Sequence, residues 1–299
     1  MASNRDDMPP DEKSEWTGVL GASCLVGRFV LQCLPQRGRV LAVSRSPSYE
    51  NRPNLRSQSA HTLSELPSCA VPNWLCLAPI WVLPDYFHEF ERLGVRRVVA
   101  LSSTSRFTKP DSSDVSERET ARRLIEGERQ LKQWAEGRGI ECVILRPTLI
   151  YGLGLDHNVS EVARFIRRFG FFPVIGPASG LRQPLHASDL ADACVAALTT
   201  TEVHSGAYNL SGGEALTYRE MVARVFAALG RSARIVRLPA GAVQWALAFA
   251  SRLPGHRHWS PSIAERMNRD QVFDHAEAAR DLGFAPRPFL PGPSDFPPE

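Results

Sequence analysis

Short apolar runs alternate along the chain with longer segments in which apolar residues recur every three or four positions. The apolar runs predict strands at 16–20, 39–43, 74–78, 97–101 and 142–145, and the helical spacing predicts helices at 25–34, 84–94 and 114–137. Continuous apolar strands that alternate with amphipathic helices are typical of a parallel sheet covered on both faces. We therefore predict a Rossmann-like, doubly wound α/β domain.

The second half of the chain has a mixed pattern. Helices are predicted over 190–198, from the capping box of Thr217 and Glu220 to about Leu229, and from Asp274 to near Gly283. We expect Phe289 and Phe296 to anchor the proline-rich end of the chain. The predicted organisation is a flexible arm (1–13), a Rossmann domain (14–155), a smaller substrate-binding or lid segment interleaved with it (156–285), and a proline-rich tail (286–299).

Composition excludes several classes of protein. The 299 residues are 43% hydrophobic and 22% charged, as in ordinary globular chains, and the net charge of +3 is too small and too dispersed to predict a nucleic-acid partner. No apolar stretch reaches the roughly 18 residues that a transmembrane helix needs. The six cysteines form no CxxC pair, and the first fifteen residues lack signal-peptide features. We expect buried free thiols and a cytoplasmic protein.

A glycine-containing turn joins the first predicted strand to the first helix, and its sequence is Gly21-Ala22-Ser23-Cys24-Leu25-Val26-Gly27. Dinucleotide-binding turns need a tight bend at the first glycine, close approach of a pyrophosphate at the second, and helix–strand packing at the third. Gly21 and Gly27 meet the first and third needs, whereas Ser23 and Cys24 occupy the place of the middle glycine. The turn predicts dinucleotide binding, and packing alone is the alternative.

The end of the second strand indicates which dinucleotide would bind. A ribose with a free 2′-hydroxyl calls for Asp or Glu at this point. The chain has Ser44-Arg45 instead, an alcohol and a cation suited to a 2′-phosphate. This favours NADP(H), with NAD(H) still possible; the alternative for Arg45 is a solvated surface arginine.

Four segments together resemble the NAD-dependent epimerase/dehydratase family of extended short-chain dehydrogenases/reductases. They are 19–23 (VLGAS), 100–104 (ALSST), 145–152 (LRPTLIYG) and 182–191 (RQPLHASDLA), and 208–217 (YNLSGGEALT) adds to the likeness. The resemblance implies an NAD(P)-binding oxidoreductase or epimerase-like enzyme whose small-molecule substrate is a nucleotide-activated sugar. It also implies a possible homodimer.

The resemblance further implies roles for single residues. As a catalytic residue, Thr104 would hydrogen-bond the reacting substrate oxygen, and Pro147 would lie near the nicotinamide. Arg182, with Arg269 as a second candidate, would bind the sugar-nucleotide diphosphate through bidentate contacts; a surface charge or an internal ion pair is the alternative for each. The phosphates of the cofactor would lie against Gly21, Ser23, Cys24, Leu25 and Gly27.

The chain departs from the family at its acid/base pair, a tyrosine and a lysine four residues apart on one helix face. Counting back from Gly127-Glu128 maps this pair to Thr120 and Leu124, and neither side chain can perform that chemistry. Leu124 is expected in the core, and His186 is expected to be a hydrogen-bonded core histidine. Other candidate acids or bases, each more typical of a structural or surface residue, are Tyr86, His88, Lys109, Tyr151 and His157.

Two further functions stay open on the sequence. A catalytically silent NADP(H)-binding regulatory or assembly protein would explain the missing pair. A peripheral membrane protein is a third hypothesis, because the segment 243–253 is apolar and contains Trp245 and Phe249. An interface or lid helix is the alternative explanation for that segment.

Overall fold

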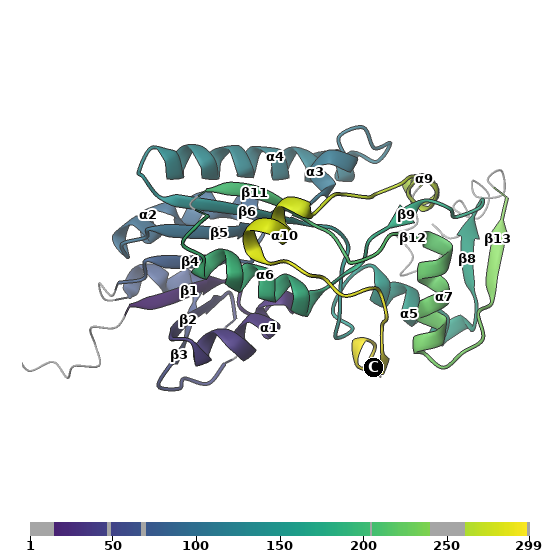
Figure 1. Ribbon diagram of the computed structural model, residues 1–299, viewed down its shortest axis with the longest axis horizontal. Helices are drawn as coiled ribbons and strands as arrows, with labels where there is room; N and C mark the ends of the chain where they lie inside the picture. Colours follow the sequence, from purple (N-terminus) through teal and green to yellow (C-terminus); the bar gives the residue numbers. More distant parts are fainter. Residues whose placement is uncertain (1–14, 47–48, 67–69, 204, 240–260, 298–299) are drawn as a thin grey trace, which may run out of the picture.

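A computed structural model describes residues 15–46, 49–66, 70–203, 205–239 and 261–297. Its centre is a seven-stranded sheet in the order β11-β6-β5-β4-β1-β2-β3, and all its strand pairs are parallel (Figure 1). The strands are β1 (Trp16–Leu20), β2 (Arg39–Ser44), β3 (Leu55–Ser59), β4 (Asn73–Cys76), β5 (Arg97–Leu101), β6 (Glu141–Pro147) and β11 (Gly206–Leu210). The predicted doubly wound parallel sheet is confirmed.

Helices cover both faces of the sheet, each over its own core. One core lies under α1 (Leu25–Cys33), α6 (Ala187–Thr199) and α10 (Ala276–Leu282). The other lies under α2 (Phe87–Arg92), α4 (Val115–Glu136) and the 3-10 helix η4 (Ile80–Tyr86). Successive strand residues alternate between the two cores, as Val19 and Leu20 do in β1, because side chains on a strand point to opposite faces.

A smaller lobe extends from the carboxyl edge of the sheet, with its own core of aliphatic and aromatic side chains (Figure 1). Phe289 and Phe296 of the tail are buried in this core, so their predicted anchoring is confirmed. The elements of the lobe are α5 (Val159–Phe169), β8 (Phe172–Ile175), α7 (Tyr218–Ala228), β13 (Ile235–Leu238) and α9 (Pro261–Asn268), and β8 pairs with β13. Two short strand pairs accompany them. Strand β7 (Ile150–Tyr151) pairs with β10 (Leu185–His186), and β9 (Leu181–Arg182) pairs with β12 (Leu216–Thr217).

Short helical turns complete the chain: η2 (Leu34–Gln36), η3 (Ala60–Glu65), α3 (Ser105–Thr108) and η5 (Pro293–Asp295). The capping box at Thr217 and the left-handed Gly283 that ends α10 are as predicted. No helix in the described part of the chain is long and apolar enough to cross a membrane. The apolar segment 243–253 lies outside the described residues.

One local expectation is wrong, and one strand was not predicted. The helix expected to open at Pro84 and Asp85 begins at Phe87, because those two residues belong to the 3-10 helix η4. Strand β3 has no apolar run that would predict it, since it lies at the sheet edge and its sequence, LRSQS, is mostly polar.

The expectation for the cysteines holds for three of them. Cys76, Cys142 and Cys194 are buried free thiols, Cys24 and Cys33 are half-buried, and Cys69 lies outside the described residues.

Candidate functional site

The glycine turn lies at the carboxyl ends of β1 and β4, where the strand order of the sheet reverses. Open α/β sheets bind ligands in the crevice at this switch point. Gly21 has a φ of +87°, and a Cβ atom there would lie 2.6 Å from the backbone nitrogen of Ala78. At Gly27 a Cβ atom would lie 2.2 Å from the carbonyl oxygen of Ala22. Both positions therefore require glycine for local geometry, whatever the turn binds.

Cys24 closes the amino-terminal end of α1 with its own side chain. Its Sγ atom accepts a hydrogen bond from the backbone N–H of Gly27 at 3.3 Å, and burial raises the pKa of the thiol. The neighbouring Ser23 is exposed and Leu25 is half-buried. One backbone donor that could face a phosphate is therefore occupied by the thiol of Cys24.

Ser44 and Arg45 follow β2 beside the glycine turn. Ser44 is buried, and its hydroxyl donates to the carbonyl oxygen of Ser46 at 2.9 Å, so it shapes the loop. Arg45 is exposed. It follows the carboxyl end of β2, where Val43 of β2 pairs with Leu20 of β1 immediately before the glycine turn. Arg45 thus lies at the edge of the same crevice.

Thr104 and Pro147 meet at the carboxyl ends of β5 and β6. The carbonyl oxygen of Pro147 accepts hydrogen bonds from the backbone N–H of Thr104 at 3.1 Å and from its hydroxyl at 3.2 Å. Thr104 is buried. The structure therefore joins the two residues that the resemblance placed at the reacting end of the cofactor.

A buried carboxylate, Glu128, organises the same strand ends. Its oxygens accept hydrogen bonds from Ser102 Oγ at 2.6 Å and from the Nε and NH2 groups of Arg146 at 3.0 and 2.6 Å. Arg106 lies 3.2 Å from it, and the Arg106 Nε is buried without a hydrogen-bond partner in the described structure. Burial lowers the pKa of Arg106. Sequence reasoning missed this cluster, although Glu128 and Arg146 each stood in a quoted motif.

Thr120 and Leu124, the positions to which the resemblance assigns an acid/base pair, have other local roles in the structure. Thr120 donates its hydroxyl to the carbonyl oxygen of Ser116 at 2.8 Å, and Leu124 is buried in the core, as expected. The cation of Arg106 nevertheless lies against Glu128, one helical turn from Leu124. This ion pair places a positive charge beside Glu128, four residues after Leu124.

The other candidate acids and bases are dispersed. Burial raises the pKa of Tyr151, and Lys109 lies 3.6 Å from the carboxylate of Glu117. His88 and His157 are exposed. His186 is buried at the end of β10, where its Nδ1 accepts from Ser188 N–H and its Nε2 lies 3.1 Å from Asp295 Oδ1. Its expected role as a core histidine is confirmed.

The two arginines proposed for the diphosphate lie next to each other, but Arg182 faces backbone oxygens. Its guanidinium donates to the carbonyls of Leu181 at 2.7 Å, Arg269 at 2.8 Å and Arg266. Burial lowers its pKa to about 10. Arg269 is exposed, with its guanidinium 3.9 Å from Glu265. A diphosphate at Arg182 would have to replace these carbonyl contacts.

The loop after β5 reaches the smaller lobe across the site. The rings of Phe107 and Phe273 lie 6.0 Å apart, and Arg266 of α9 forms an ion pair of 3.0 Å with Glu117 of α4. Ser112 donates to the same buried carboxylate at 2.6 Å. These contacts join the two sides of the crevice beside Thr104.

The chain is similar to known proteins in part of its sequence and in its fold. Residues 85–211 match the model of the NAD dependent epimerase/dehydratase family. The likeness to this family covers that part of the chain. A solved structure, "MoeE5 in complex with UDP-glucose and NAD", shares the fold with a TM-score of 0.67 and 20% identity, over 93% of this chain and 95% of that one.

Two curated relatives match shorter stretches. An uncharacterized protein, y4nG of Sinorhizobium fredii (strain NBRC 101917 / NGR234), is 29% identical over 201 residues, which cover 65% of this chain and 50% of that protein. The mitochondrial NADH dehydrogenase [ubiquinone] 1 alpha subcomplex subunit 9 of Arabidopsis thaliana is 31% identical over 100 residues, or 33% of this chain and 25% of the subunit. The chain thus matches half or less of the length of each of these two relatives.

Proposed function

We propose that this chain is an NAD(P)-dependent oxidoreductase of the epimerase type that acts on a nucleotide-activated sugar. The observation that carries the proposal is the glycine turn at the switch point of the sheet, with Thr104 and Pro147 joined at the neighbouring strand ends. The match of residues 85–211 to the epimerase/dehydratase family and the UDP-glucose and NAD of the similar solved structure support the same class.

In this proposal each of these residues has its own role. A bound nicotinamide would accept or donate hydride. The glycine turn would hold its pyrophosphate, and the Thr104 hydroxyl would exchange its bond to Pro147 for one to the reacting oxygen. Arg182 and Arg269 would bind the diphosphate of the substrate, and the pairing of Arg106 with Glu128 would keep a positive charge near the reacting centre. The proton donor would be a group other than the tyrosine–lysine pair.

A catalytically silent NADP(H)-binding regulatory or assembly protein is the second candidate. Three observations favour it: the absence of tyrosine and lysine at positions 120 and 124, the thiol of Cys24 in the turn, and the likeness to an NADH dehydrogenase subunit. Both candidates predict cofactor binding, so turnover decides between them. Incubation of the purified protein and cofactor with UDP-sugars, followed by product analysis, supports the enzyme if product forms and the silent protein if none does.

The partner and location of the protein stay predictions. The outward side of α4 carries intrahelical ion pairs, such as Glu119 with Arg122 at 2.7 Å and Glu126 with Arg129. Such a charged surface is typical of a helix that faces solvent. This surface gives no further support to the homodimer or to the cytoplasmic location.

The preference for NADP(H) can be tested by calorimetric titration of cofactor-stripped protein with NADPH and NADH. We expect tighter binding of NADPH, because the exposed cation of Arg45 suits a 2′-phosphate. An Arg45→Ala variant should lose on the order of tenfold in NADPH affinity, the worth of one charged hydrogen bond, and keep its NADH affinity. An equal loss of affinity for NADPH and NADH would show that Arg45 does not bind the 2′-phosphate.

Replacing Cys24 with glycine should tighten cofactor binding. The change restores the middle glycine and releases the Gly27 N–H from the thiol, so that a phosphate oxygen can accept this hydrogen bond. One additional charged hydrogen bond corresponds to an affinity gain of about tenfold. Cys24→Ser is the matched control, since its hydroxyl still caps the helix and should give no gain. If Cys24→Gly binds no better than wild type, the thiol does not limit binding.

A further inference from the structure

The smaller lobe carries exposed phenylalanine and arginine side chains at the carboxyl end of α5. Phe169 is 43% exposed and Phe171 is 37% exposed, on either side of Gly170. Val236 of the neighbouring strand β13 is 45% exposed. Large apolar side chains exposed together are a feature of interaction surfaces, whereas single ones are not.

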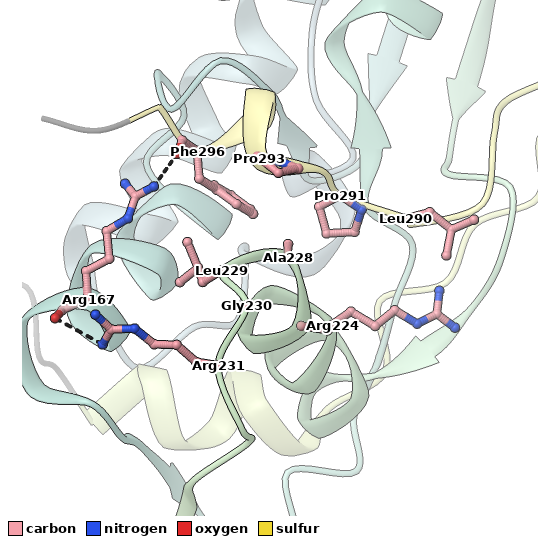
Figure 2. A pocket seen from close by; sticks show the side chains of 11 residues that line it. Arg167, Arg224, Ala228, Leu229, Gly230, Arg231, Leu290, Pro291, Pro293 and Phe296 are labelled. Carbon is pink, nitrogen blue, oxygen red and sulfur yellow. Dashed lines mark hydrogen bonds between the residues drawn. The ribbon is translucent and has the colours of Figure 1, made fainter.

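Arginines border these apolar side chains. The guanidinium of Arg168 lies 5.4 Å from the centre of the Phe169 ring. Arg231 extends across the end of α5 and donates to the carbonyls of Ile166 at 2.8 Å and Arg167 at 3.2 Å (Figure 2). The carbonyl of Arg234 accepts from Phe172 N–H at 2.9 Å, so Arg234 neighbours Phe171 across the two strands. We call this surface the basic–aromatic face: Arg168, Phe169, Phe171, Arg231, Arg234 and Val236.

The positive charge of this face is not neutralised within the described structure. The sequence contains no Asp or Glu in residues 162–188 or 221–264, the two stretches that supply the face. No carboxylate among the described residues forms an ion pair with its three arginines. On α4, by contrast, exposed Arg122 and Arg129 each pair with a glutamate of the same helix.

The cavity beside this face does not provide a site of its own. It has a volume of about 840 Å³ and lies between α5, α7 and the tail. Arg167 and Arg231 point toward it (Figure 2) but donate to backbone carbonyls. Arg224 pairs with Glu214. The charges of Arg168 and Arg234, which do not line the cavity, are therefore on the outer surface.

We propose that the basic–aromatic face docks the protein on an anionic membrane surface. Arginines attract anionic headgroups, and phenylalanine side chains between them can enter the boundary between headgroups and acyl chains. A second copy of the chain is disfavoured, because a two-fold contact would place these arginines against one another. The rings pack on each other, with Phe165 and Phe169 4.6 Å apart, rather than standing as separate platforms for stacked bases. The face lies on the lobe away from the glycine turn, so this inference does not depend on the proposed function.

The experiment is co-sedimentation of the full chain with vesicles of phosphatidylcholine alone and of phosphatidylcholine mixed with phosphatidylglycerol. We expect binding to the anionic vesicles only, and less binding at high salt. The double variant Arg168→Gln/Arg234→Gln should lose about fivefold in partition coefficient per arginine. Part of the binding should persist at high salt, because salt does not screen the apolar contacts. The double variant Phe169→Ser/Phe171→Ser should weaken this part.

The matched control is Arg122→Gln/Arg129→Gln on α4, which removes the same charge from arginines that already have glutamate partners. It should bind anionic vesicles like wild type. Equal losses in the two arginine variants would overturn the assignment to this face, as would absence of binding to anionic vesicles. The protein could instead bind RNA or polyglutamate through Arg168 and Arg234 and not bind vesicles. This result would overturn the membrane proposal and indicate another polyanion as the partner. Circular dichroism of each variant separates lost binding from lost folding.

Discussion

Replacing Glu128 with alanine should lower the free energy of unfolding by about 3–5 kcal/mol, the usual cost of removing one partner from a buried ion pair. The carboxylate accepts hydrogen bonds from Ser102 and Arg146 and pairs with Arg106. Without it, two arginines with little solvent exposure would face each other without a counter-charge. Urea unfolding, followed by circular dichroism, measures this change.

The same helix provides the control. Glu126 is two residues away and pairs with Arg129 on the exposed side of α4, so Glu126→Ala should leave the urea midpoint close to that of wild type. Glu128→Gln keeps the size and part of the hydrogen bonding but not the charge. If Glu128→Gln is as stable as wild type, hydrogen bonding rather than charge holds the cluster. If Glu128→Ala is also as stable, the cluster does not support the strand ends.

Much of the fold follows from local pattern. Strands buried on both faces read as continuous apolar runs, so β1, β2, β5 and β6 are predictable within one or two residues. Strand β3 is not, because an edge strand buries less of its surface and needs no apolar run. The helix predicted at Pro84 began later, because proline at a first turn is equally compatible with a 3-10 segment.

The site was predictable where its geometry is local. The roles of Gly21 and Gly27 depend on a turn seven residues long, and the structure provides the close backbone contacts that require them. The Glu128 cluster joins residues 18 and 26 positions apart, which no spacing rule connects. Arg182 stands in a recognisable motif, but the motif does not predict that its guanidinium donates to three backbone carbonyls.

The contacts that hold the crevice in place can be distinguished from the side chains that would carry out its chemistry. The turn, the bond between Thr104 and Pro147, and the ion pair of Glu128 with Arg146 hold the crevice in place. Cys24 places a thiol at the turn, and positions 120 and 124 hold threonine and leucine. If positions 120 and 124 are those of the acid/base pair, the chain either uses another proton donor or has a binding role. The effect of removing one hydroxyl group distinguishes these two cases.

That hydroxyl is Thr104. In the proposed enzyme, Thr104→Val should lower kcat by about 10²–10³-fold, because valine fills the same volume but cannot donate a hydrogen bond to the reacting oxygen. Affinity for the cofactor should not change, since the valine backbone still donates its N–H to Pro147. The measurement is conversion of the UDP-sugar found active in the screen, with calorimetry for the cofactor.

Thr104→Ser is the matched control, because it keeps the hydroxyl and loses only a methyl group, and it should retain most of the turnover. Unfolding curves exclude a general effect, since removal of one buried hydrogen bond costs about 1 kcal/mol. Equal turnover in Thr104→Val and wild type would place the reaction elsewhere in the crevice. A fall in turnover with Thr104→Val but not with Thr104→Ser would tie the reaction to this hydroxyl, and the search for the proton donor would then begin among the groups within its reach.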